Sequence, residues 1–256
     1  MNSKSNDRGA DLERYNPPPA TMDGERLIAV FSQLIEPLGR TLPISSEIIL
    51  HDFSKMPNSI VAIHGNVTGR KVGDPATNYL LERVSEGRFE NDIGYETSLP
   101  DGRRLKSSTM IIRDISNSPV AALCINSDVS VWAELQSIAS AMIRGSESVP
   151  PVISPDARVA RTLPSHQSGL SREWFPKNVD ELAEYLIRRA IDCSGVSVSE
   201  MKKKDKVQVV GYLKSKGFFL LKDAIEMIAS ELEITRFTIY NYLNELEEAE
   251  MAPGKP

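Results

Sequence analysis

A proline-rich stretch near the middle of this chain favours two separate domains over one. Ser and Arg are frequent between its prolines, which are Pro150, Pro151, Pro155, Pro164 and Pro176. Because proline lacks a backbone donor and interrupts helices, we expect a linker at 145–176. Two folded domains remain, and we place them at 23–144 and 177–250. The polar segment 1–22 is expected to be a flexible arm, and 251–256 a short tail.

Charge and cysteine content limit the classes of protein to which the chain can belong. Its 256 residues include 30 Lys and Arg against 35 Asp and Glu, so any contact with nucleic acid must come from a local basic patch. Cys124 and Cys193 lie too far apart in sequence for a zinc site or a secreted disulfide framework. No apolar run approaches the ~20 residues that span a bilayer, and the first residues lack the apolar core of a signal peptide. We therefore expect a cytoplasmic protein that does not enter a membrane.

Hydrophobic periodicity in the first segment predicts an α+β domain. It begins with a helix capped by Asp23, and a second, short helix is expected to start at Asp74 and Pro75. The predicted elements are, in order, a helix at 23–38, strands at 47–53 and 59–64, the short helix, strands at 95–99, 104–113 and 119–127, and a helix near 132–143. This order predicts a five-stranded antiparallel sheet with helices to one side, which is the plan of a PAS-type sensor.

The second segment is expected to be helical throughout. Apolar stripes predict four helices, at about 179–191, 204–215, 221–232 and from Thr235 onward. Between the last two, Ala229 is small enough for close approach, Ile234 fills the turn, and Ile239 with Leu243 faces back into the bundle. This pattern is typical of a helix-turn-helix, whose second helix enters the major groove of double-stranded DNA.

One face of the last predicted helix carries side chains suited to reading DNA. The candidates are Thr235, Arg236, Phe237, Thr238, Tyr240 and Asn241. Arginine can bind guanine and asparagine can bind adenine, so Arg236 and Asn241 suit base contacts, whereas Thr238 and Tyr240 suit phosphate oxygens. Residues 202–222 hold seven lysines against one acid, and the phosphate contacts expected from this run are Lys202, Lys203 and Lys204. The alternatives are helices that simply pack together and lysines that are merely solvated.

Polar residues in the first domain are candidates for binding a small-molecule effector. The loop 65–74 contains three glycines that permit positive φ, and its Arg70 and Lys71 could hold an anion. Ser107, Thr109 and Asn126 lie among apolar residues on strands expected to pair, and a buried hydroxyl or amide needs a partner. That partner is either a ligand or another strand residue, and the loop cations either contact a ligand or are solvated. The residues alone do not decide between these alternatives.

No set of residues in the sequence points to catalysis, a metal or a cofactor. His51 and His64 lie on neighbouring predicted strands, but no cysteine or carboxylate cluster at metal-binding spacing accompanies them. None of the usual motifs that pair a nucleophile with a base occurs. We therefore expect a protein without enzymatic activity.

Three stretches of the chain resemble a known family. HDFSKMPNSIVAIHGNVTGRKVGDP at 51–75, and DGRRLKSSTMIIRD with AALCINSDVS within 101–130, look like the YheO-like PAS domain. ITRFTIYNYL at 234–243 is similar to the helix-turn-helix that accompanies this domain in bacterial transcriptional regulators of the D-arginine utilisation repressor type. The resemblance covers about 23–140 and 178–248. It implies a cytoplasmic DNA-binding regulator, usually without enzymatic activity, whose PAS domain senses a small molecule.

Together these observations predict a one-component regulator in which an effector bound to the first domain changes the DNA affinity of the second, and the resemblance implies that it is a repressor. A single helix-turn-helix makes few base contacts, so we expect a homodimer that reads two half-sites. The helices expected at 23–38 and 130–144 have apolar residues to spare and are the candidates for the dimer seam. The competing hypothesis is a PAS-type sensory adaptor whose helical domain binds a protein partner rather than DNA.

Overall fold

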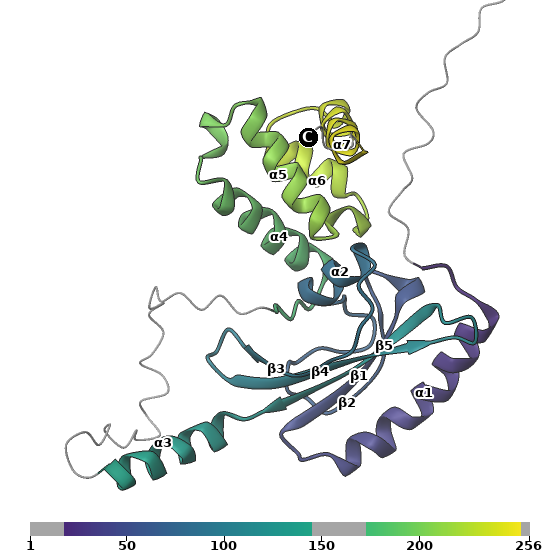
Figure 1. Ribbon diagram of the computed structural model, residues 1–256, viewed down its shortest axis with the longest axis vertical. Coiled ribbons are helices and arrows are strands. Elements are labelled where there is room, and N and C mark those ends of the chain that lie inside the picture. Colours follow the sequence, from purple (N-terminus) through teal and green to yellow (C-terminus); the bar gives the residue numbers. More distant parts are fainter. Residues whose placement is uncertain (1–17, 145–172, 252–256) are drawn as a thin grey trace, which may run out of the picture.

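The computed structural model describes residues 18–144 and 173–251, and its first domain is built on a five-stranded antiparallel sheet (Figure 1). The strand order is β2-β1-β5-β4-β3. The elements are α1 (Met22–Thr41), β1 (Ser46–Asp52), β2 (Ile60–His64), α2 (Asn78–Ser85), β3 (Asp92–Ser98), β4 (Arg104–Arg113), β5 (Pro119–Asp128) and α3 (Ser130–Arg144). The predicted α+β domain with PAS-like order of elements is confirmed.

Helices cover both faces of the sheet, whereas the sequence suggested one face only. Ile48 and Leu50 of β1 pack with Ile35 of α1 in one apolar cluster. Ile49 points to the opposite face and belongs to the apolar cluster that also contains Leu81 of α2. Figure 1 shows α1 and α2 on opposite sides of the sheet. A strand buried on both faces carries a continuous apolar run instead of an alternating one, and these three consecutive residues of β1 form such a run.

The first two helices begin differently from the sequence prediction because threonine, not aspartate, provides each cap. Thr21 Oγ1 accepts a hydrogen bond at 3.0 Å from a backbone N–H in the first turn of α1, where Asp23 was expected to act. Thr77 Oγ1 does the same for α2 at 3.2 Å, where Asp74 was expected. Asp74 Oδ2 instead accepts from the Lys71 backbone N–H at 2.9 Å. The aspartate therefore closes the loop that leads to α2.

The second domain is a bundle of four helices, as predicted. They are α4 (Val179–Ser194), α5 (Lys203–Ser215), α6 (Ala224–Glu231) and α7 (Arg236–Met251). Short 3-10 turns precede α5 and α6, at Val198–Glu200 and Phe218–Leu220. Side chains from all four helices form a shared core that includes Leu182, Val209, Leu213, Phe218, Ile228, Leu232, Ile239 and Leu243.

The second domain rests on α2 of the first domain. Lys216 Nζ, just after α5, lies 2.7 Å from Glu82 Oε1 of α2. Gly217 comes so close to α2 that an added Cβ would lie 2.9 Å from the carbonyl oxygen of Leu81. A single cluster of buried apolar residues extends from the sheet through α2 into the helical bundle. The two domains therefore share part of their core.

The last residues of the expected linker pack on the first domain. The predictions for 1–17, 145–172 and 252–256 lie outside the described residues. Within 173–176, Phe175 is buried in a small cluster with Leu99 and Leu105. The Trp174 backbone N–H donates to Asn78 Oδ1 of α2, and the Trp174 ring stacks on Tyr185 of α4, with ring centroids 5.2 Å apart and an angle of 5°. This short segment thus contacts both domains.

Candidate nucleic-acid interface and sensor interior

The turn between α6 and α7 sets the direction of the last helix. The Ile234 N–H donates to the Ala229 carbonyl at 3.0 Å, which holds the start of α7 close to the end of α6. Glu233 takes a left-handed conformation with φ of 52° within this turn. Thr235 Oγ1 then accepts from the Thr238 N–H at 3.2 Å and caps α7. The two helices have the arrangement that the sequence predicted for a helix-turn-helix.

The N-terminal half of α7 presents aromatic and polar side chains to solvent. Four residues on one face are exposed, with Phe237 at 73%: Arg236, Phe237, Tyr240 and Asn241. Thr235 is exposed as well, and Thr238 is half-buried with its hydroxyl 2.9 Å from that of Thr235. The opposite face of α7 is anchored by buried Ile239 and Leu243. All six residues predicted for α7 therefore lie together at one end of the helix, and their contact with DNA stays a prediction.

Arg236 is held on this face by an ion pair with the preceding helix. Its Nη1 atom lies 2.7 Å from Glu226 Oε1, and its side chain is 67% exposed. The hydrogen bond from Arg236 lowers the pKa of the Glu226 carboxyl. Because the pair lies in solvent, a base or phosphate can compete with Glu226 for the guanidinium without disrupting any core packing.

The predicted lysine run divides into an exposed part and a structural part. Lys202, Lys203 and Lys204 are exposed at the start of α5. Lys203 Nζ lies 2.8 Å from Glu245 Oε2, which places the start of α5 beside α7. The remaining lysines are mostly engaged elsewhere: Lys206 donates to the Leu232 carbonyl, Lys214 pairs with Glu247, and Lys216 pairs with Glu82. Composition alone could not separate these roles, because they depend on packing between helices.

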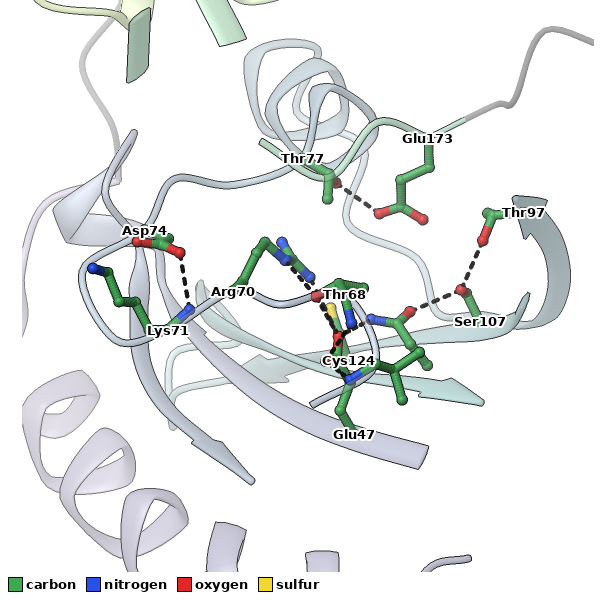
Figure 2. Close-up of polar contacts among 12 residues, drawn as sticks. Glu47, Thr68, Arg70, Lys71, Asp74, Thr77, Thr97, Ser107, Cys124 and Glu173 are labelled. Carbon is green, nitrogen blue, oxygen red and sulfur yellow. Dashed lines mark hydrogen bonds and ion pairs between the residues drawn. The ribbon is translucent and has the colours of Figure 1, made fainter. Parts of the chain in front are cut away.

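The interior of the first domain contains a polar network centred on Glu47 of β1 (Figure 2). The buried Oε2 atom accepts from the backbone N–H groups of Val67 and Thr68 at 2.8 and 2.9 Å. Oε1 accepts from Thr68 Oγ1 at 2.7 Å and from Asn126 Nδ2 at 2.9 Å. Ser107 Oγ extends the network by donating to Asn126 Oδ1 at 2.8 Å. Sequence analysis missed Glu47, although an acid next to a continuous apolar run was an available signal.

Three of the predicted ligand residues belong to this interior. Ser107 and Asn126 are members of the Glu47 network, and Thr109 Oγ1 lies 3.0 Å from Tyr95 OH. All three are buried. Cross-strand hydrogen bonding is thus present at each of them, and their contact with a ligand stays a prediction.

The two predicted loop cations lie in different environments. The Arg70 side chain is 1% exposed, its Nη2 atom lies 3.9 Å from Glu47 Oε1, and its guanidinium stands 5.1 Å from the ring centroid of Phe175. Among the described residues, its buried Nη1 atom has no hydrogen-bond partner. Lys71 is exposed on the same loop. The loop therefore directs one cation into the domain and the other to solvent.

A second buried carboxylate reaches this interior from the segment between the domains (Figure 2). Glu173 is 5% exposed, and its oxygens accept from Thr77 Oγ1 at 2.7 Å and from Tyr95 OH at 3.0 Å. Burial, and then the charge of Glu173, raise the pKa of Tyr95 far above its ordinary value, so the phenol stays a donor. Sequence analysis missed Glu173 because it falls in the proline-rich stretch. The adjacent Trp174 and Phe175, two aromatic residues in a polar region, were the only signal.

Two other buried groups are neutral at physiological pH. Burial, with a further effect of the Arg70 charge, lowers the pKa of His51 well below 6.5, and its Nδ1 atom lies 2.8 Å from Ser59 Oγ. Burial also raises the pKa of the Cys124 thiol to about 12.

In 18–144 and 173–251 no group of three or more His, Cys, Asp or Glu side chains could hold a metal ion. No helix in these ranges is long and apolar enough to cross a membrane.

Comparison with known proteins agrees with both halves of this architecture. Residues 22–144 match the family described as the YheO-like PAS domain, and residues 182–244 match an HTH (helix-turn-helix) domain family. The transcriptional regulator DauR of Pseudomonas aeruginosa is 27% identical over 205 residues, which are 79% of this chain and 86% of its own. An uncharacterised protein of Haemophilus influenzae is 25% identical over 234 residues (90% and 96%), and the uncharacterised protein YheO of Escherichia coli is 24% identical over 246 residues (94% and 93%). The chain belongs to the family of proteins that join a YheO-like PAS domain to a helix-turn-helix domain.

Proposed function

We propose that this protein is a transcriptional repressor that binds double-stranded DNA through α7 and changes its affinity when a small molecule binds the PAS domain. The two matched domains and the regulator among its relatives support a DNA-binding regulator. One observation carries the assignment of the interface: Arg236, Phe237, Tyr240 and Asn241 are uncovered together at the start of α7. The exposed lysines 202–204 lie at the start of α5, where Lys203 pairs with Glu245 farther along α7. A helix end of this kind can enter the major groove while its flanks meet phosphates.

Each side chain of this interface has a role that follows from its chemistry. Arg236 would exchange Glu226 for the O6 and N7 atoms of guanine, and Asn241 would bind adenine. Phe237 suits the methyl group of thymine. Thr235, Thr238, Tyr240 and the lysines 202–204 would donate to phosphate oxygens and set the register.

A homodimer is part of the proposal, and α3 supplies the support for it. Val131, Leu135, Ile138 and Met142 follow a spacing of four, three and four residues, and each side chain is at least half exposed. This spacing is that of a coiled-coil seam, so two copies of α3 placed side by side would cover it. Figure 1 shows α3 projecting beyond the sheet. On α1, exposed Val30, Leu34 and Leu38 offer a second apolar surface.

The test of DNA binding uses fluorescence polarisation with a duplex selected on the protein from genomic fragments. Affinity should fall steeply between two salt concentrations, because binding releases counterions. Arg236→Ala should weaken binding by roughly 5- to 150-fold, the range for one bidentate base contact. Lys203→Ala should reduce the salt slope by about one.

Arg188→Ala is the matched control for this experiment. Arg188 lies on α4, is 71% exposed and pairs with Glu184 at 2.5 Å, so it repeats the exposed ion pair of Arg236 away from α7. It should leave affinity unchanged. Equal affinities for wild type and Arg236→Ala would refute the interface, and absence of DNA binding at both salt concentrations would favour the sensory adaptor.

A further inference from the structure

We propose that the interior of the PAS domain is a carboxylate-binding site for a small organic acid, and that Glu173 occupies this site when the effector is absent. The proposal deepens the ligand-sensing part of the proposed function and rests on it. It names the chemical class of the effector and the residues that would bind it, namely Thr77, Tyr95 and Arg70.

The first support is the way in which the Glu173 carboxylate is held. Each of its oxygens accepts a hydrogen bond, one from Thr77 Oγ1 at the start of α2 and one from Tyr95 OH on β3. The side chain is buried, and removing a carboxylate from water is unfavourable unless donors replace the lost hydration. The domain therefore contains a preformed set of donors matched to a carboxylate.

The second support is independent of Glu173 and lies in the guanidinium of Arg70. Its Nη1 atom is buried and has no hydrogen-bond partner among the described residues. Figure 2 places this guanidinium and Glu173 on the same side of the sheet. An unpartnered buried donor is unfavourable in a finished core, and an anionic ligand larger than one carboxyl group would satisfy it.

Glu173 lies in the chain outside the PAS domain, so a ligand can replace its side chain in the site. The PAS domain itself is matched by residues 22–144, and Glu47 is built into its first strand. Glu173 instead comes from the segment that leads into α4. A ligand can take its place without disturbing any strand of the sheet, whereas displacement of Glu47 would break β1 from the loop that it holds.

Displacement of Glu173 would be transmitted to the DNA-binding domain through its two neighbours. Phe175 packs against Arg70, and Trp174 stacks on Tyr185 of α4. Glu173 thus contacts the sensor interior, Trp174 the first helix of the bundle, and Phe175 the sensor loop. A ligand that binds only the form with Glu173 displaced shifts the population toward a state in which α4 has lost this attachment.

The experiment uses the full-length Glu173→Ala protein, with acetate as the probe and acetamide as its neutral match. Alanine empties the carboxylate position, so acetate should raise the melting temperature of this variant saturably, by about 3–6 °C at ten times its dissociation constant. Wild type should shift less, because its own side chain competes. Sodium chloride at equal ionic strength controls for screening. Equal shifts for acetate and acetamide, or for variant and wild type, would overturn the proposal.

A second variant and a second readout keep the test decisive if Glu173→Ala is too unstable. Glu173→Gln preserves the shape of the side chain but presents one acceptor oxygen instead of two, and it too should gain more from acetate than wild type does. In Trp132→Phe protein, Trp174 is the remaining tryptophan, and Glu173→Ala should shift its emission to longer wavelength. Unchanged emission would contradict the release of the segment. Both measurements omit DNA, so their failure is distinct from a failure of DNA binding.

Discussion

Replacement of Glu47 by glutamine tests whether the sensor interior depends on a buried negative charge. Glutamine keeps the size of the side chain and one acceptor oxygen. That oxygen can still accept from the N–H groups of Val67 and Thr68, which bind Oε2 in the wild type. The new NH₂ group then faces the Asn126 amide that now donates to Oε1 at 2.9 Å. Either Asn126 turns over, or a buried donor is left without an acceptor.

The expected loss of stability follows from the buried cation. Leaving one buried donor unpaired costs about 1–3 kcal/mol. Arg70, with its side chain 1% exposed, loses the carboxylate that lies 3.9 Å away, and breaking a buried pair costs roughly 3–5 kcal/mol. The two costs arise from the same carboxylate and do not simply add, so we expect about 3–5 kcal/mol in total. At about 2–4 °C per kcal/mol for a protein of this size, the melting temperature should fall by roughly 6–20 °C.

Thermal unfolding followed by circular dichroism measures this loss, with Glu96→Gln as the matched control. Glu96 lies on β3, is 80% exposed and pairs with Arg104 at 3.4 Å, so the same substitution there should change little. Adding Arg70→Met to Glu47→Gln should recover part of the loss, because no unpaired charge then remains. A Glu47→Gln protein that melts within 1 °C of wild type, or a double variant equal to the sum of the single ones, would refute the role of the charge.

Four further predictions concern pH, domain contact, DNA affinity and thiol reactivity. The folded protein keeps His51 neutral below pH 6.5, whereas the unfolded chain takes up a proton there. The free energy of unfolding should therefore fall with decreasing pH below about 6.5, at up to about 1.4 kcal/mol per pH unit. In urea unfolding, the difference in this free energy between pH 5 and pH 7 should be smaller for His51→Asn than for wild type. Gly217→Ala should destabilise the protein by about 1–3 kcal/mol more than Gly87→Ala does. Both glycines have positive φ, but only a Cβ at 217 would meet α2, at 2.9 Å from the Leu81 carbonyl oxygen. Equal melting temperatures for the two variants would contradict this. Glu226→Gln should strengthen DNA binding in polarisation titrations because it frees Arg236 and removes a negative charge, and Glu184→Gln should not. Dithionitrobenzoate at pH 8 should label the exposed Cys193 in the folded protein and should reach the buried Cys124, whose pKa is about 12, only after unfolding. Rapid labelling of both thiols in the folded protein would show that the interior is open to the reagent.

Local patterns were sufficient for the elements of both domains and for the exposed face of α7. Period-2 and period-3.6 spacing depends on neighbours a few residues apart, so strand and helix positions such as 104–113 and 179–191 were predicted closely. The same reasoning grouped Arg236, Phe237, Tyr240 and Asn241, because residues three and four positions apart on a helix are neighbours on its surface. The predicted caps of α1 and α2 were wrong, since Thr and Asp both suit that position and backbone geometry selects between them.

Tertiary structure alone decided where the buried charges lie. Glu47 and Asn126 are 79 residues apart, and Thr77 and Glu173 are 96 apart, so no short-range pattern reports that they meet. The lysine run is similar: packing assigned Lys206, Lys214 and Lys216 to structural contacts and left Lys202 to Lys204 exposed. The sequence by itself determined which segments form helices and strands and which face of α7 is polar, because those properties depend on adjacent residues. The tertiary structure decided which charges are buried together, because desolvation and ion pairing depend on the distance in space between residues that are remote along the chain.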